Sequence, residues 1–174
     1  VNEAIQADIA EMEAMITSLL AYLGGDGDAE PRVAVDLAVL CATVADDGRD
    51  RGHDVSYHGP DHHEIVVRPI AIKRALVNLV ENGLHHADRV WITLDRTGGD
   101  TLICVEDNGP GIPEEMLGTV IQPFVRLDSA RSRDTVGLGL GLSIVARMAE
   151  GEGGSFLLAN RGSGGLRAEI RLPG

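Results

Sequence analysis

Asp107 stands where a short apolar run meets the turn sequence Asn-Gly-Pro-Gly. The run predicts a strand, and a carboxylate at its end would be held rigidly at the edge of a sheet. Such a carboxylate accepts a hydrogen bond from an amino group like that of adenine, and it repels the carbonyl oxygen of guanine. Gly109 and Gly111 lack the Cβ that would keep the backbone away from a flat ring. The stretch therefore indicates an adenine pocket, although a plain β-turn with an Asx cap has the same residues.

A second stretch, Gly137 to Val145, places glycines at three alternating positions before an apolar run that predicts a helix. Free backbone N–H groups at a helix start, with no side chains in the way, form a cradle for phosphate. The stretch is not the dinucleotide-binding fingerprint, because no strand–helix–strand unit leads into it. A flexible hinge would show the same glycines, so this stretch indicates a phosphate site only together with the others.

The helix expected from Pro69 to about Ala87 carries two asparagines one turn apart. Asn78 and Asn82 share a polar stripe with His85 and His86, beside a separate apolar face. Mg²⁺ prefers oxygen ligands and usually keeps water and phosphate oxygens with only one or two protein ligands, so the amide oxygen of Asn82 suits it. Asparagine is a poor helix former, which favours a binding role for this pair over simple solvent exposure.

The segment from Asn108 to Leu138 has little periodicity and many turn residues, which predicts a lid or a binding loop. Arg126 and Arg131 within it could meet phosphate charge, although a solvated surface also carries single arginines.

The elements that must position these residues alternate between helix and strand. Helices are expected over Asp36–Arg51, Pro69–Ala87 and Leu140–Glu150. Strands are expected in six places: His53–His58, Glu64–Pro69, Arg89–Asp95, Thr101–Asp107, Gly154–Asn160 and Gly165–Pro173. We expect an α+β fold, a two-layer sandwich of a mixed five-stranded sheet with three helices on one face, preceded by one bundle helix.

The first 23 residues carry an apolar residue at alternating spacings of four and three. This seven-residue repeat predicts a bundle or coiled-coil helix that needs a partner helix or a second chain. An ordinary amphipathic helix packed on the domain is the alternative. The seam consists of Ile5, Ile9, Met12, Ile16, Leu19 and Leu23.

The 174-residue chain has a formal net charge of −12, which repels a phosphate backbone and predicts no nucleic-acid partner. Cys41 and Cys104 lie in apolar surroundings, which predicts buried thiols in a reducing compartment. No apolar run reaches the length of a membrane span and no signal peptide is visible, so we expect a cytoplasmic location. Because the sequence begins at Val1 rather than at Met, we expect it to be part of a longer protein.

Four stretches occur in one order along the chain: "NLVEN", "DNGPG", "PFVRLDSAR" and "GLGLGL". Together they resemble the catalytic ATP-binding domain of sensor histidine kinases, within the superfamily of gyrase, Hsp90, histidine kinase and MutL ATPases. The resemblance runs from about Ala34 to the C-terminus and is greatest to osmosensor kinases of the EnvZ kind. It implies ATP and Mg²⁺ as ligands, and transfer of the γ-phosphate to a histidine and then to a response-regulator aspartate.

The resemblance also implies roles for individual residues. Asn82 would bind Mg²⁺, Asn78 would be the catalytic residue that orients the phosphates and the metal, and Asp107 would contact the adenine amino group. The other residues implied to form the ATP site are His85, His86, Gly109, Gly111, Ile112, Phe124, which would anchor the lid, Arg126, Arg131, Gly137, Leu138, Gly139, Leu140 and Gly141.

Asn78 has a chemical consequence, because ATPases of this superfamily that hydrolyse ATP place a glutamate there as the general base for water. An amide cannot take up a proton. Attack by water should therefore be slow, which leaves ATP for transfer to a better nucleophile such as an imidazole nitrogen.

The resemblance divides the chain into three parts. Residues 1–24 are expected to be the second helix of the dimerisation and histidine-phosphotransfer bundle, 25–33 a linker, and 34–174 the catalytic domain. A full-length protein of this kind is a homodimer through the bundle and can be anchored in the inner membrane. No His-Glu-Leu-Arg-Thr-Pro type of motif occurs, so we expect no phosphoacceptor here. Leu138 and Glu152 depart from the family pattern, which commonly has threonine and histidine there.

Three other functions are compatible with parts of this pattern. A non-catalytic adaptor that binds a response regulator would show no Mg–ATP affinity. A hydrolysing ATPase of the chaperone or topoisomerase kind would release phosphate steadily without an acceptor, and Asn78 disfavours it. A protein-serine kinase of the anti-sigma type is disfavoured by the bundle helix.

Overall fold

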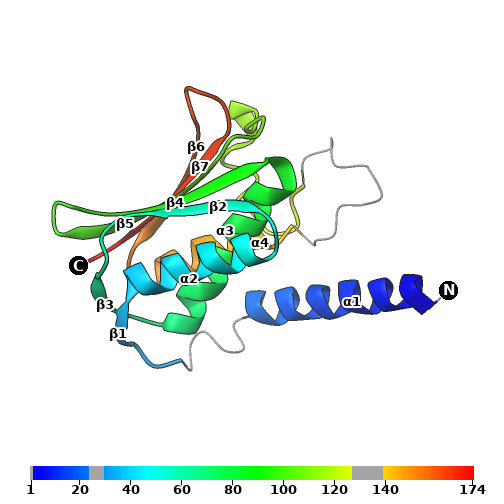
Figure 1. Cartoon of the computed structure of the whole chain (residues 1–174), viewed down its shortest axis with the longest axis horizontal. Coiled ribbons are helices and arrows are strands. Elements are labelled where there is room, and N and C mark those ends of the chain that lie inside the picture. Colours follow the sequence, from blue (N-terminus) through cyan, green and yellow to red (C-terminus); the bar gives the residue numbers. More distant parts are fainter. Residues whose placement is uncertain (1, 24–29, 127–138) are drawn as a thin grey trace.

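The computed structural model describes residues 2–23, 30–126 and 139–174 (Figure 1). The helices in these ranges are α1 (Asn2–Tyr22), α2 (Leu37–Asp50), α3 (Pro69–His86) and α4 (Gly141–Gly151), with a 3₁₀ turn η1 at Glu114–Met116. The strands are β1 (Val33–Asp36), β2 (Asp54–His58), β3 (Glu64–Val67), β4 (Arg89–Thr97), β5 (Asp100–Asp107), β6 (Ser155–Asn160) and β7 (Leu166–Leu172).

Five of the strands form the mixed sheet that the sequence predicts. Their order is β2-β4-β5-β7-β6, with β2 parallel to β4 and the other pairs antiparallel. Helices α2, α3 and α4 pack on one face of this sheet, so the predicted two-layer fold is confirmed (Figure 1).

The period of two along the strands explains which side chains form the core. In β5, Ile103, Val105 and Asp107 are buried at alternate positions, and the helices cover this face. Cys41 and Cys104 are both buried free thiols, as predicted, and burial raises the pKa of Cys41 to about 12. Asp107 is thus the polar end of a buried strand, as predicted.

A second, two-stranded sheet was not predicted. β1 pairs antiparallel with β3, so that Val33, expected in the linker, lies opposite Val67. The strands expected on either side of Gly59-Pro60 are present as β2 and β3, but they belong to different sheets. A parallel pair needs a crossover connection, and α3 provides it between β2 and β4.

Helix α1 leaves its apolar seam exposed. It extends away from the rest of the chain and contacts α4 near its C-terminal end (Figure 1). The exposed fractions along the seam run from 38% at Leu19 to 67% at Leu23. The described part of the domain therefore does not cover this seam, and the assignment of α1 to a bundle stays a prediction. No helix in the described ranges is long and apolar enough to span a bilayer.

Candidate functional site

Asp107 is the last residue of β5 and is only 6% exposed. Its Oδ1 accepts hydrogen bonds from the backbone N–H of Gly109 at 2.8 Å and of Leu166 at 3.2 Å. Both recorded hydrogen bonds to the carboxylate thus end on Oδ1, and within the described residues none ends on Oδ2. Within the described residues the carboxylate is therefore held through Oδ1.

The loop after Asp107 packs closely against protein atoms. A Cβ at Gly109 would lie 2.8 Å from the carbonyl oxygen of His86, and one at Gly111 would lie 2.6 Å from Oδ1 of Asn160. Gly111 also has a φ of 75°, which favours glycine. The side chain of Asn160 fixes Ile112 in turn, because Oδ1 accepts from the N–H of Ile112 at 2.9 Å and Nδ2 donates to its carbonyl at 2.6 Å. The glycines therefore allow the loop to close on its own protein surroundings.

Helix α3 brings Asn78 to the start of α4. Asn78 and Asn82 are both half-buried. A Cβ built on Gly141, the first residue of α4, would lie 4.0 Å from Cβ and Cγ of Asn78. The polar stripe of α3 and the last glycine of the glycine-rich stretch are thus adjacent in space, as a shared phosphate site requires.

The same helix also reaches Asp107. A Cβ on Gly83, the residue after Asn82, would lie 2.7 Å from Cγ2 of Val90 and 3.5 Å from Cβ of Asp107. The absence of a side chain at Gly83 lets α3 lie close to the ends of β4 and β5. Asn82 and Asp107 are therefore on neighbouring elements in direct contact.

Asn78 contains a buried polar atom without a partner. Its Nδ2 is inaccessible to solvent and has no hydrogen bond within the described part of the chain. Such a group lowers stability, and buried polar groups are generally satisfied. A ligand oxygen at this place would satisfy it.

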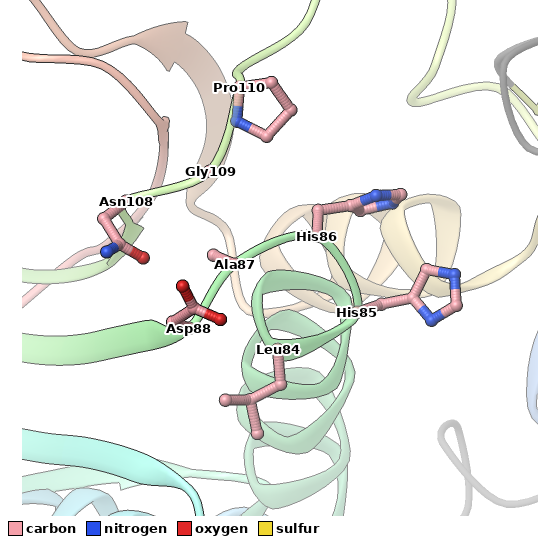
Figure 2. A pocket seen from close by; sticks show the side chains of 8 residues that line it. All are labelled: Leu84, His85, His86, Ala87, Asp88, Asn108, Gly109 and Pro110. Atoms are coloured by element: carbon pink, nitrogen blue, oxygen red, sulfur yellow. The ribbon is translucent and has the colours of Figure 1, made fainter.

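An open cavity of about 460 Å³ lies between the end of α3 and the loop after β5 (Figure 2). His85, His86 and Gly109 are the predicted site residues among those that line it, whereas Asn82 and Asp107 are not. The rings of His85 and His86 are 4.8 Å apart and nearly perpendicular, and both extend to the same side of the helix end (Figure 2). Partial burial, and then the neighbouring His85, lower the pKa of His86, which disfavours the charged form of this imidazole. The cavity is completed by Leu84, Ala87, Asp88, Asn108 and Pro110.

The two flanks of the segment 127–138 meet at Phe124 and Gly139. The N–H of Phe124 donates to the carbonyl of Gly139 at 3.0 Å, and both residues have positive φ, 65° and 71°. The ring of Phe124 is 58% exposed and lies 6.1 Å from the ring of Tyr22 at the end of α1. Arg126 lies beside Gly139, with its Cγ 3.2 Å from a Cβ built there.

The other predicted lid residues divide into two groups. Leu140 is 1% exposed, so its side chain belongs to the core and only its backbone faces the start of α4. Arg131, Gly137 and Leu138 lie outside the described residues.

Glu152 is the departure from the family pattern that has the clearest structural role. It is 2% exposed, and its carboxylate forms ion pairs with Arg68 at 3.1 Å and Arg32 at 3.2 Å. These contacts join the segment before β1 to the start of α3 and the end of α4. A glutamate in a polar context is usually exposed, so this burial has no signal in the sequence.

Sequence reasoning also missed the residues behind Asp107. Asn160, Arg161 and Leu166 all hydrogen-bond the end of β5 or the loop after it. A Cβ at Gly165 would lie 1.9 Å from the carbonyl oxygen of Asp107. The glycine-rich hairpin turn was visible in the sequence, but its contact with β5 depends on the tertiary fold.

Comparison with known proteins agrees with this geometry. The family described as histidine kinase-, DNA gyrase B-, and HSP90-like ATPase matches residues 67–174, which contain α3, Asp107 and α4. The chain belongs to this ATPase family. A curated relative, the sensor histidine kinase GtrS of Pseudomonas aeruginosa, is 33% identical over 99% of this chain. The chain spans 35% of the length of that relative.

Two solved structures of this ATPase family show the same fold. The ATP-binding domain of PrrB from Mycobacterium tuberculosis has a TM-score of 0.70 and 30% identity, over 83% of this chain and 98% of its own. The histidine kinase domain of the Escherichia coli osmosensor EnvZ has a TM-score of 0.61 and 32% identity, over 82% of this chain and 89% of its own. The predicted resemblance to the ATP-binding domain of sensor histidine kinases is confirmed, and the adaptor, chaperone-type and anti-sigma alternatives are not favoured.

Proposed function

We propose that this chain binds Mg–ATP between α3, the end of β5 and the start of α4, and donates the γ-phosphate to a histidine on a bundle helix outside the chain. The phosphate then passes to an aspartate of a response regulator. The observation that supports this best is the position of α3, which lies beside Gly141 at Asn78 and beside Asp107 at Gly83.

The base end fits adenine. Oδ1 of Asp107 is occupied by two backbone N–H groups, so Oδ2 is the oxygen that can accept the adenine amino group. A guanine in the same orientation would place its carbonyl oxygen against this carboxylate, which is unfavourable.

The phosphate end fits a polyanion and its metal. The unpartnered Nδ2 of Asn78 suits a phosphate oxygen as acceptor, and the start of α4 beside it offers backbone N–H groups. Among the described residues no three His, Cys, Asp or Glu side chains gather as a metal cage. Mg²⁺ would be held by the amide oxygen of Asn82 together with phosphate and water, and it would neutralise phosphate charge. The expected ATP contacts from the lid are predictions, and they come from Arg131, Gly137 and Leu138.

The chemistry follows from what Asn78 cannot do. An amide does not accept a proton, so no carboxylate at this position activates water. The attacking group is then the imidazole nitrogen of the acceptor histidine, which forms a bond to the γ-phosphorus as the bond to the bridging oxygen of ADP breaks. The chain contributes mainly positioning and charge stabilisation, as is usual in phosphoryl transfer.

The exposed seam of α1 supports the rest of the proposal. Six apolar side chains in a seven-residue repeat have no cover within the described chain, which suits the second helix of a dimeric bundle. In the full-length protein we expect a homodimer through this helix, a cytoplasmic location for the catalytic domain, and compatibility with a membrane anchor elsewhere.

The proposal is tested by mixing this chain with a bundle that carries an acceptor histidine and following ³²P from γ-labelled ATP. We expect labelled bundle, no label on this chain, and little free phosphate when the bundle is left out. A chain without Mg–ATP affinity would be the non-catalytic adaptor. Steady phosphate release without the bundle would favour a hydrolysing ATPase.

A further inference from the structure

Arg161 lies in the turn after β6 and makes four contacts around the end of β5. Its Nη1 donates to the carbonyl oxygens of Asp107 and Gly164, both at 2.9 Å, and its Nε donates to Oε1 of Glu106 at 3.2 Å. The guanidinium also lies over the ring of Trp91, 4.3 Å from its centroid. Its side chain is 21% exposed. A largely buried arginine with this many partners is held in one orientation.

Glu106 and Trp91 form a cluster with Arg161, and Nη1 of Arg167 also lies 3.7 Å from Oε1 of Glu106. Trp91 pairs directly with Glu106 across β4 and β5, and its Nε1 donates to Oε2 of Glu106 at 3.1 Å. Because side chains alternate along a strand, Glu106 faces the side of the sheet opposite to Asp107. The cluster of Trp91, Glu106 and Arg161 therefore supports the end of β5 from the face away from the helices.

The turn that carries Arg161 also holds the carboxylate of Asp107. The N–H of Arg161 donates to the carbonyl of Gly165 at 2.9 Å, and the next residue, Leu166, donates its N–H to Oδ1 of Asp107. Gly165 itself approaches the carbonyl of Asp107 so closely that no Cβ would fit. One turn thus fixes both the peptide and the side chain of Asp107, and the guanidinium of Arg161 attaches this turn to β5.

We propose that Arg161 is a positioning residue for base selection, which holds Asp107 so that Oδ2 meets the amino group of adenine. The inference rests on the proposed role of Asp107 in nucleotide binding. A carboxylate held rigidly cannot turn away from the carbonyl oxygen of guanine, whereas a loosened one can. Loss of the guanidinium should therefore weaken the binding of ATP but not that of GTP, so that the preference for ATP over GTP falls.

The test is the ratio of GTP to ATP dissociation constants, measured by calorimetry in excess Mg²⁺. We expect Arg161→Met to weaken ATP binding by about tenfold, the loss of one well-placed hydrogen bond. GTP binding should stay the same or become tighter, because the loosened carboxylate can turn away from the guanine carbonyl. The matched control is Arg171→Met, because Arg171 pairs only with Asp100 and Glu169 among the described residues. The control should keep the wild-type ratio.

A second pair of variants keeps the test decisive. Arg161→Lys retains the charge beside Glu106 but cannot make all the bonds of a guanidinium, so a stable fold with a lowered ratio is expected. Adding Arg161→Met to Asp107→Asn should leave the ratio where Asp107→Asn alone puts it, because Arg161 acts through Asp107. Emission of Trp91, the sole tryptophan, shows whether the cluster is intact in each variant.

The possible outcomes separate this inference from the proposed function. If wild type prefers ATP and Asp107→Asn loses the preference, but Arg161→Lys and Arg161→Met keep it, the role of Arg161 is wrong and the site stands. Equal losses for ATP and GTP would also overturn it, because they indicate general loosening. If wild type shows no preference for ATP, both the assignment of Asp107 and this inference fail.

Discussion

The base end and the phosphate end of the proposed ATP site are built in opposite ways. At the base end, Asp107 receives backbone hydrogen bonds on Oδ1, and Arg161 binds its carbonyl oxygen. At the phosphate end, Nδ2 of Asn78 is buried without a partner in the described chain. The first arrangement stabilises the fold without a ligand, whereas the second opposes folding until a ligand satisfies it. In the proposed site the base end is therefore preformed, whereas the phosphate end would depend on its ligand.

The largest effect is expected from Asn82→Ala, which removes the proposed metal ligand. Affinity for ATP in excess Mg²⁺ should fall at least about 100-fold, or ~2.7 kcal/mol, because the metal and the phosphate charge lose their shared contact. Calorimetry with and without EDTA measures this. Glu81→Ala, on the exposed side of the same helix, is the control and should bind like wild type. Unchanged Mg²⁺ dependence in Asn82→Ala would show that the metal lies elsewhere.

The next effect concerns the base end. Asp107→Asn retains an oxygen for the backbone N–H groups but loses the charge that faces adenine. ATP affinity should fall by about 1.5–3 kcal/mol, roughly 10- to 150-fold, as for a hydrogen bond to a charged group. GTP affinity should not fall and should rise if anything, because the charge that repels the guanine carbonyl is gone, and fluorescence or calorimetric titration can verify this. The exposed Asp88, which lines the nearby cavity, gives the control Asp88→Asn. ATP binding as tight as in wild type would remove Asp107 from the adenine site.

A smaller effect concerns the stability of the chain without nucleotide, which substitutions at the two ends should change in opposite directions. Asn78→Leu removes the unpartnered amide and improves helix propensity, so the free energy of unfolding without nucleotide should rise by about 1 kcal/mol. Asn108→Leu at the base end should lower it by about the same amount, because Oδ1 of Asn108 accepts from the N–H of Arg89 at 3.0 Å. Urea unfolding of both variants measures this. Destabilisation by both changes would mean that the phosphate end is preformed as well.

The smallest effect is a pH dependence outside both ends. Hydrogen bonds from the N–H of His63 and from His62 lower the pKa of Asp36 to about 2, and the bond to Asp36 raises the pKa of His62. The contribution of the carboxylate is present above its ordinary pKa of 3.8 and is lost as the pH falls towards 2. The contribution of His62 is present below its ordinary pKa of 6.5 and is lost as the pH rises through the raised value.

The pair should therefore stabilise the domain most between the two ordinary values, 3.8 and 6.5. His62→Asn should lower the melting temperature there by roughly 2 °C or less, with no difference at pH 9, because the pair is exposed. Thermal unfolding across this range measures it, while the ATP-to-GTP preference should stay unchanged. A constant difference at all pH values would mean that charge is not the cause.

The sequence predicted the elements that have a clear local signal. The strand that ends at Asp107, the helix that begins at Pro69 and the hairpin formed by β6 and β7 all follow from periodicity and turn residues. The pairing of β1 with β3 was missed, because a strand of four residues has too few positions to show a period.

The residues of the candidate site could be predicted from the sequence, but the residues that hold them in place could not. Asn82 and Asp107 carry chemistry that is visible in the sequence. Arg161 binds Asp107 and Glu152 pairs with Arg68, in each case a residue more than 50 positions away. A single sequence shows no such partners, so charged side chains of this kind are taken as surface residues.

A structure of this chain with Mg²⁺ and a non-hydrolysable ATP analogue tests the central claim most directly. We predict that the adenine amino group lies about 3 Å from Oδ2 of Asp107, and that the amide oxygen of Asn82 binds Mg²⁺ on the triphosphate of the same molecule. A nucleotide that occupies the cavity beside His85 and His86 and contacts neither Asp107 nor Asn82 would contradict the account.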